Sequence, residues 1–237
     1  MLLTALVSVF TLSSCFNSDT GERWDWACFA TVQETYMGVY LSGDDGVTYY
    51  PTNPDYLRLN TSDGSVKYAE RVFVYMKYVE ETGTTPKAKS KNVTIVSASG
   101  IPVRSLCDRP DTIKNTLPLA TFNAMGVTRG YVTVDFALYY AGGNISFDLF
   151  PEKVEGDLLT LRLKQTYGKD AYGTNPQGYL MSFKMPNFDN LQNQIQDLGL
   201  DPLTPEQDSI YVKVIATGSN DSDLTLDSQL KFRMGIY

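Results

Sequence analysis

Histidine is absent from the 237 residues, and cysteine occurs only three times. Without histidine there is no Ser-His-Asp or Cys-His nucleophile, no histidine-bound zinc and no imidazole to move protons near neutral pH. Basic charge is also scarce, since 20 Lys and Arg stand against 27 Asp and Glu, a net charge of −7. Binding to phosphates needs clustered cations, so we expect no nucleic-acid partner.

Long hydrophobic runs are lacking apart from one at the start of the chain. Residues 1–14 carry no charge and would cover about 21 Å as a helix, short of the roughly 30 Å hydrocarbon core of a bilayer. We therefore predict a signal peptide over 1–14 rather than a membrane-spanning helix. The segment ends in Leu12-Ser13-Ser14-Cys15, which resembles the bacterial lipobox. That resemblance implies cleavage before Cys15 and attachment of a diacylglyceryl group (with palmitate as a typical acyl chain) to its thiol.

The N-terminal segment leaves alternatives open. No Lys or Arg precedes the apolar run, so either the true start lies upstream of Met1 or the signal is atypical. The competing interpretation is an N-terminal strand with a buried thiol at Cys15. Residues 15–23 are polar and suit a flexible tether. We expect an outer-membrane lipoprotein of the bacterial envelope, facing the periplasm or the cell surface, with a lipid anchor and no cofactor.

The first half of the remaining chain has the pattern of a small β-barrel. Alternating apolar and polar residues predict strands over Trp24–Gln33, Tyr36–Ser42, Val47–Tyr50, Glu70–Glu80 and Val93–Ala98. Five short strands in about 75 residues favour a closed barrel of the OB type over 24–100. Three prolines then interrupt the periodicity, which predicts a linker over 101–118.

The second half, 119–237, is predicted to be an antiparallel β-sandwich. In the strand Thr128–Ala141, the core face consists of Val132, Val134, Phe136, Leu138 and Tyr140. Asn187–Leu198 places apolar residues on one helical stripe, with Asn187 as N-cap and Gly199 at the end. The predicted fold class is therefore all-β, an OB-like five-stranded barrel followed by an antiparallel β-sandwich with one short helix.

Two cysteines remain once Cys15 is set aside. In an oxidising envelope compartment Cys28 and Cys107 are candidates for a disulfide, which would stabilise the fold by restricting the unfolded chain. The alternative for Cys28 is an inert buried thiol, because it stands in an alternating strand pattern.

The order of these segments resembles the NigD-like lipoproteins of gut and oral Bacteroidetes. The resemblance implies an N-terminal OB-type barrel, a C-terminal β-sandwich and an envelope location. It brings no catalytic residue, and the family name comes from a bacteriocin-associated operon. The segments that carry it, besides the lipobox, are Ala30-Thr31-Val32, Asp44-Asp45-Gly46-Val-Thr-Tyr-Tyr-Pro51, Arg71-Val-Phe-Val-Tyr-Met-Lys-Tyr78, Val93-Thr-Ile-Val96, Gly130-Tyr-Val-Thr-Val-Asp-Phe136, Ile145-Ser-Phe-Asp-Leu149, Leu159-Thr-Leu-Arg-Leu-Lys164 and Tyr179-Leu-Met-Ser-Phe183.

Aromatic residues are the candidates for ligand binding, because OB barrels bind oligonucleotides or oligosaccharides partly through stacking. Ordinary cross-strand packing is the interpretation that we favour for each of them, because aromatic pairs are enriched in any sheet. The candidates are Tyr36, Tyr40, Tyr49, Tyr50, Phe73, Tyr75 and Tyr78.

Charged and modified sites give weaker indications. Lys87, Lys89 and Lys91 are interpreted as a solvated loop rather than a ligand site. The aspartates of 220–227 lack the glycine and glutamate of an EF-hand, so we predict a polar turn and no metal. Asp111-Thr112-Ile113 resembles the O-glycosylation pattern of Bacteroidetes, with Thr112 as the acceptor, and Asp208-Ser209-Ile210 resembles it too.

These features favour a membrane-anchored protein that binds or scaffolds and catalyses nothing. A carbohydrate-binding accessory protein is the first alternative, and a bacteriocin-associated, immunity-type protein is another. A carboxylate hydrolase would need two acidic residues at a defined separation in a cleft, and the sequence singles out no such pair.

Overall fold

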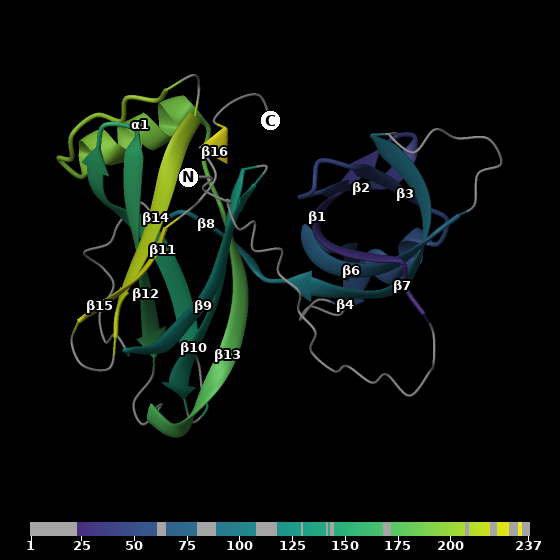
Figure 1. The fold of residues 1–237 in the computed structure, drawn as a ribbon, viewed down its shortest axis with the longest axis horizontal. Coiled ribbons are helices and arrows are strands. Elements are labelled where there is room, and N and C mark those ends of the chain that lie inside the picture. Colours follow the sequence, from purple (N-terminus) through teal and green to yellow (C-terminus); the bar gives the residue numbers. More distant parts are fainter. Residues whose placement is uncertain are drawn as a thin grey trace, which may run out of the picture.

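A computed structural model describes residues 23–60, 65–79, 89–107, 118–128, 130–140, 142, 145–167, 172–206, 209–218, 222–227 and 232–233. The predicted signal peptide, the lipid attachment at Cys15 and the glycosylation acceptor Thr112 lie outside these residues. Figure 1 shows two bodies side by side, a barrel and a sandwich, joined where β7 leads into β8. Among the described residues, no helix has the length and apolar character to cross a bilayer.

The barrel is closed and has the predicted five strands. They run in the order β1-β2-β3-β7-β6, with β6 pairing back onto β1 and β3 parallel to β7. Its core is formed by alternate, inward-facing residues of the strands, including Leu41, Val74 and Ile95. The five strands are β1 (Trp26–Thr35), β2 (Gly38–Gly43), β3 (Thr48–Pro51), β6 (Arg71–Tyr78) and β7 (Ser90–Ile101).

An insertion between β3 and β6 packs against one end of the barrel. It consists of the 3-10 helix η1 (Pro54–Leu57) and the hairpin β4 (Arg58–Asn60) and β5 (Val66–Tyr68). Asn53 fixes it, because its side chain accepts from the Ile95 N–H at 2.8 Å and donates to the Ile95 carbonyl at 2.9 Å. Leu57 is fully buried in the barrel core. The opposite end, where β1 and β7 begin and β6 ends, is therefore the one that η1 leaves uncovered.

The sandwich consists of two sheets around one core. The first has the order β8-β13-β10-β9, and the second has β11-β12-β14-β15 with β16 also paired to β14. The predicted core face of β10 is confirmed, since its five residues are all buried. The strands are β8 (Val103–Ser105), β9 (Leu119–Thr128), β10 (Tyr131–Tyr140), β11 (Ile145–Glu155), β12 (Leu158–Tyr167), β13 (Tyr172–Lys184), β14 (Ser209–Thr217), β15 (Asp223–Asp227) and β16 (Phe232–Arg233).

Three details of the sandwich differ from the prediction. It is not purely antiparallel, because β12 pairs with β14 and β13 with β8 in parallel. The segment predicted as a linker contains β8, which belongs to the first sheet. The polar stretch predicted as a turn contains β15, whose Asp223 pairs with Thr217 of β14. β8 has only three residues and is too short to show alternation, whereas β15 does alternate but was interpreted from its aspartates as a polar turn.

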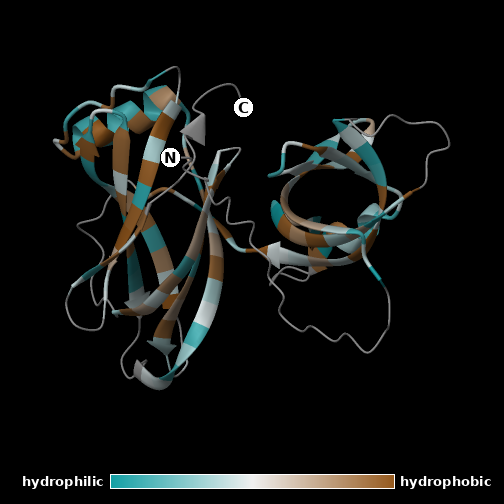
Figure 2. Ribbon diagram, viewed as in Figure 1, coloured by the Kyte–Doolittle hydropathy of each residue, from teal (hydrophilic) through white to brown (hydrophobic). Residues whose placement is uncertain are grey.

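The predicted helix is present as α1 (Phe188–Asp197), on the connection from β13 to β14. Asn187 caps it, since its side-chain oxygen accepts from the Asn190 N–H at 3.0 Å. Gly199 follows with a φ of +68°, the left-handed conformation that ends many helices. Leu191 and Ile195 bury the apolar stripe against the sandwich core. Along the strands of both bodies, hydrophobic and hydrophilic residues alternate (Figure 2).

Candidate binding surfaces of the barrel

Exposed apolar side chains are concentrated on the barrel. Among the described residues, nine of the ten large hydrophobic side chains that are exposed belong to 24–79 and one, Tyr211, to the sandwich. The nine lie at several separate places on the barrel, and each place is a candidate binding surface. The nine are Trp24, Trp26, Tyr36, Met37, Tyr50, Tyr56, Leu59, Val66 and Val79.

One group lies on β2 and β3 and at the turn before them. Tyr40 and Tyr50 are ring neighbours, with centroids 6.0 Å apart. The turn between β1 and β2 presents Tyr36 and Met37, which are 98% and 82% exposed. Strands two and three of an OB barrel, with the loop before them, form the usual ligand surface of that fold. The predicted platforms Tyr36, Tyr40 and Tyr50 therefore lie on that surface.

A second group forms a ladder on the outer face of β1 and β6. Phe29 and Phe73 are cross-strand neighbours with centroids 4.8 Å apart, and Phe73 meets Tyr75 edge-on at 5.2 Å. Trp24 continues the row, 5.1 Å from Tyr75. Phe73 and Tyr75 were predicted as platforms, whereas Trp24 and Phe29 were not, because residue spacing alone gave them no distinct role.

The third group lies at the barrel end that η1 leaves uncovered. The Asp45 carboxylate accepts from the Trp26 indole N–H at 2.9 Å and the Tyr49 hydroxyl at 2.5 Å. Gly43 permits this packing, because a Cβ there would stand 2.7 Å from the Tyr49 ring. Tyr49 itself is buried, so packing, the interpretation favoured for it from the sequence, is observed and it is no platform. It is a core residue whose hydroxyl orients Asp45.

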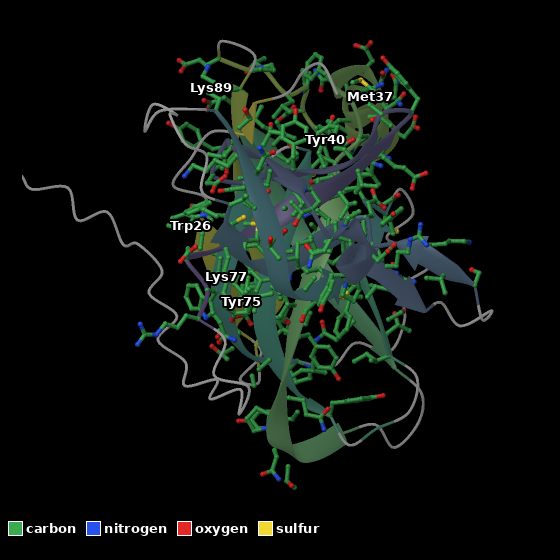
Figure 3. The ribbon with its side chains drawn as sticks, turned by 90° about the vertical axis from the view of Figure 1, so that its right-hand side faces the viewer. Trp26, Met37, Tyr40, Tyr75, Lys77 and Lys89 are labelled. Carbon is green, nitrogen blue, oxygen red and sulfur yellow. The ribbon has the colours of Figure 1, made fainter. Side chains whose placement is uncertain are left out.

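Cations stand around the same end. Lys91 Nζ lies 4.1 Å from the centroid of the Tyr78 ring, a cation–π distance that places this predicted platform under a lysine. Figure 3 shows Trp26, Lys77 and Lys89 toward one end of the barrel and Met37 toward the other. Of the predicted basic cluster, Lys89 directly precedes β7 and Lys91 is its second residue, whereas Lys87 lies outside the described residues.

Arg71 joins the barrel to the sandwich. Its guanidinium is fully buried and forms two hydrogen bonds with the Asp44 carboxylate, at 2.7 and 2.8 Å. It also donates to Thr31 at 3.0 Å and, across the junction, to Thr133 of β10 at 3.4 Å. The Tyr131 ring covers it at 4.9 Å. The outer face of β10 is buried at this point because the barrel docks on it.

Glu70 adds an ion pair to the junction. Its carboxylate accepts from the Tyr131 hydroxyl at 2.7 Å and from Lys184 Nζ at 2.9 Å. Partial burial alone would raise the pKa of Glu70, but the hydrogen bonds from Tyr131 and Lys184 outweigh burial and leave that pKa lowered. In the sequence, Glu70 and Arg71 are only the first residues of a predicted strand. Their role at the junction has no local signal, because their partners lie up to 114 residues away.

The candidate disulfide is not formed. Cys28 and Cys107 are not bonded to each other, because Cys28 points into the barrel core and Cys107 follows β8, where its N–H donates to the Leu149 carbonyl at 2.7 Å. Burial, followed by the charges of Asp45 and Asp44, raises the pKa of the Cys28 thiol to about 12. The alternative weighed for Cys28, an inert buried thiol, is the one observed.

The acidic segment near the C-terminus is engaged within the sandwich. The Asp223 carboxylate forms two hydrogen bonds with Arg162 at 2.9 Å, and Glu152 pairs with the same guanidinium. These bonds lower the pKa of Asp223. Within the described residues no group of three or more Cys, Asp or Glu has the arrangement of a metal site.

Solved structures with the same fold come from Bacteroidetes. A proposed lipoprotein from Bacteroides fragilis matches with a TM-score of 0.56 at 12% identity, over 89% of this chain and 99% of its own. A NigD-like immunity protein from Bacteroides caccae matches with a TM-score of 0.51 at 15% identity, over 86% and 93%. The chain has the fold of the NigD-like proteins.

A protein of unknown function, DUF1344, from Bacteroides vulgatus shares this fold as well, with a TM-score of 0.56 at 18% identity over 86% of this chain and 90% of its own. No family model matches the sequence, and no curated protein does. The order of the sequence segments predicted a resemblance to the NigD-like proteins. This resemblance is thus confirmed at the level of the fold.

Proposed function

We propose that the chain is a non-enzymatic lipoprotein of the bacterial outer membrane, anchored through Cys15, in which the barrel binds a partner and the sandwich supports it. The concentration of exposed apolar side chains on the barrel carries this proposal. The buried contact of Arg71 and the ion pair of Glu70 with the sandwich support it further, because they hold the barrel in one orientation. A lipoprotein among the structural neighbours agrees with the anchor.

The anchor is tested by Cys15→Ala in cells supplied with labelled palmitate. We expect the variant to lose the label and to leave the membrane fraction, because the lipid is the proposed attachment. Cys107→Ala is the matched control, since it also removes one thiol but should keep label and location. Membrane association and labelling that survive Cys15→Ala would refute the anchoring.

Carbohydrate binding is the second candidate, and the Tyr40–Tyr50 pair favours it. Two neighbouring rings on the ligand surface of an OB barrel, Tyr50 exposed and Tyr40 half-buried, suit stacking against sugar rings. A glycan array probed with the purified chain would detect a ligand. Tyr50→Ser should then abolish binding, whereas Tyr56→Ser, which removes an exposed tyrosine on η1, should preserve it. The immunity-type role rests on the name of one structural neighbour, and we do not propose it.

A further inference from the structure

We propose that the end of the barrel opposite η1 rests on the phospholipid bilayer to which the chain is anchored. This end, called the tryptophan end below, is defined by Arg23, Trp24, Trp26, Tyr75, Lys77, Tyr78, Val79, Lys89 and Lys91. The inference rests on the proposed anchoring at Cys15 and adds a second, non-covalent contact with the same membrane.

Chain length brings the tryptophan end to the membrane. The described fold begins at Arg23, and Trp24 already packs on Tyr75. Only nine positions separate Cys15 from Trp24, so a fully extended chain spans at most about 30 Å and a flexible one averages about 15–18 Å. An acyl chain on Cys15 therefore keeps this end of the barrel within reach of the lipid headgroups.

The side chains found there are those that prefer a membrane interface. Trp24 is 52% exposed and Trp26 is 41% exposed, and Val79 is exposed beside them at the end of β6. Tryptophan and tyrosine favour the boundary between headgroups and acyl chains, because the ring is apolar and its N–H or O–H can still meet water. An isolated soluble surface gains nothing from exposing these groups, whereas a bilayer removes them from water.

Charge at the tryptophan end is compatible with headgroups. Arg23, Lys77 and Lys89 extend from it, whereas the carboxylates of Asp25 and Asp45 are used within the barrel. The chain between β6 and β7 also carries acidic residues, so the net charge of this region is small. Burial of the rings, rather than attraction to anionic lipid, must therefore supply the affinity.

The contact would also orient the molecule. Met37, in the turn between β1 and β2, marks the other end of the barrel (Figure 3), so a tryptophan end that lies on the membrane directs this turn away from it. The surface with the Tyr40–Tyr50 pair then remains open to a soluble ligand. This orientation links the anchor to the proposed binding role.

Tryptophan fluorescence tests the proposal directly, because both tryptophans of the chain lie at this end. The mature lipidated chain, purified from membranes, is reconstituted into vesicles of zwitterionic and anionic phospholipids, with or without acyl-chain bromination as a contact quencher. Since Trp26 is also held by Asp45, insertion of Trp24 alone should lower the emission about twofold in brominated vesicles. Trp26→Phe, which leaves Trp24 as the sole fluorophore, should be quenched more strongly.

The matched control moves the fluorophore to the opposite end. In Trp24→Phe/Trp26→Phe/Met37→Trp the new indole replaces a side chain that is 82% exposed, and brominated lipid should not quench it. Two results would overturn the proposal and leave the lipid anchor intact. One is quenching of the indole at both ends, and the other is no quenching at either end although the chain floats with the vesicles. A chain that fails to float would contradict the anchoring as well.

Discussion

Arg71 combines a bidentate ion pair with contacts to both bodies of the molecule. A guanidinium offers five donors in a fixed plane, and here they serve Asp44, Thr31 and Thr133 at once. A buried cation without such partners would be very costly, so the site depends on all of them together. No local pattern announces this role, because the partners stand 27, 40 and 62 residues away in the sequence.

Arg71→Ala should destabilise the barrel by about 3–5 kcal/mol, because it leaves the Asp44 carboxylate without its cation in a largely buried position. Lys153→Ala, which breaks an exposed pair with Glu155, should cost at most about 1 kcal/mol. Urea unfolding followed by far-UV circular dichroism measures both, since that signal reports on the strands of the barrel and of the sandwich. Equal costs for the two variants would show that the Arg71 pair is not special.

Cys28 should be almost unreactive in the folded chain. The thiolate is the nucleophile, and burial raises the pKa of this thiol to about 12, so the reactive form is scarce at neutral pH. A thiol-specific chromogenic reagent should therefore modify Cys28 only when the chain is unfolded in denaturant. Peptide mapping would identify which cysteine has reacted. Rapid labelling of Cys28 in the native protein would contradict the burial described here.

Helix α1 has only ten residues, so its stability depends strongly on the caps at its two ends. Asn187→Ala should cost about 1 kcal/mol, because the Asn190 N–H loses its capping oxygen. Asn190→Ala is the control, as it keeps that N–H and changes an exposed side chain on the same turn. Thermal unfolding of the sandwich compares the two; an equal loss in both would refute the capping role.

Elements differed in how well the sequence predicted them. Long strands with clear alternation, such as β10, and the capped helix α1 were predicted correctly, because burial imposes a period on their residues. β8 was missed because it is too short to show alternation, and β15 because its aspartates were interpreted as a polar turn. The parallel pair β12–β14 was missed because pairing direction leaves no trace in composition.

The junction of the two bodies should make the whole molecule sensitive to acid. The pKa of Glu70 is lower in the folded state than its ordinary value of 4.5, so its contribution to stability is present above pH 4.5 and is lost as the pH falls through the folded value. Glu70→Gln should remove that part of the pH dependence and leave stability at pH 7 reduced.

Unfolding curves of the wild type and Glu70→Gln between pH 7 and pH 3 measure this effect. The difference in free energy of unfolding between the two proteins should become smaller as the pH falls, because both then carry a neutral side chain at position 70. A gap that stays constant or widens toward low pH would exclude the Glu70 ion pair as its source.

The sequence by itself determined the all-β class, the five strands of the barrel and the capped helix, because local periodicity and end residues encode burial and turns. It also placed Tyr36, Tyr40 and Tyr50 among the binding candidates. Only the tertiary structure decided that Tyr49 is a core residue, that Cys28 and Cys107 are held apart, and that Trp24 and Trp26 share one uncovered barrel end. Closing the barrel and docking it on the sandwich bring distant residues together, and such distances are not written in any local pattern.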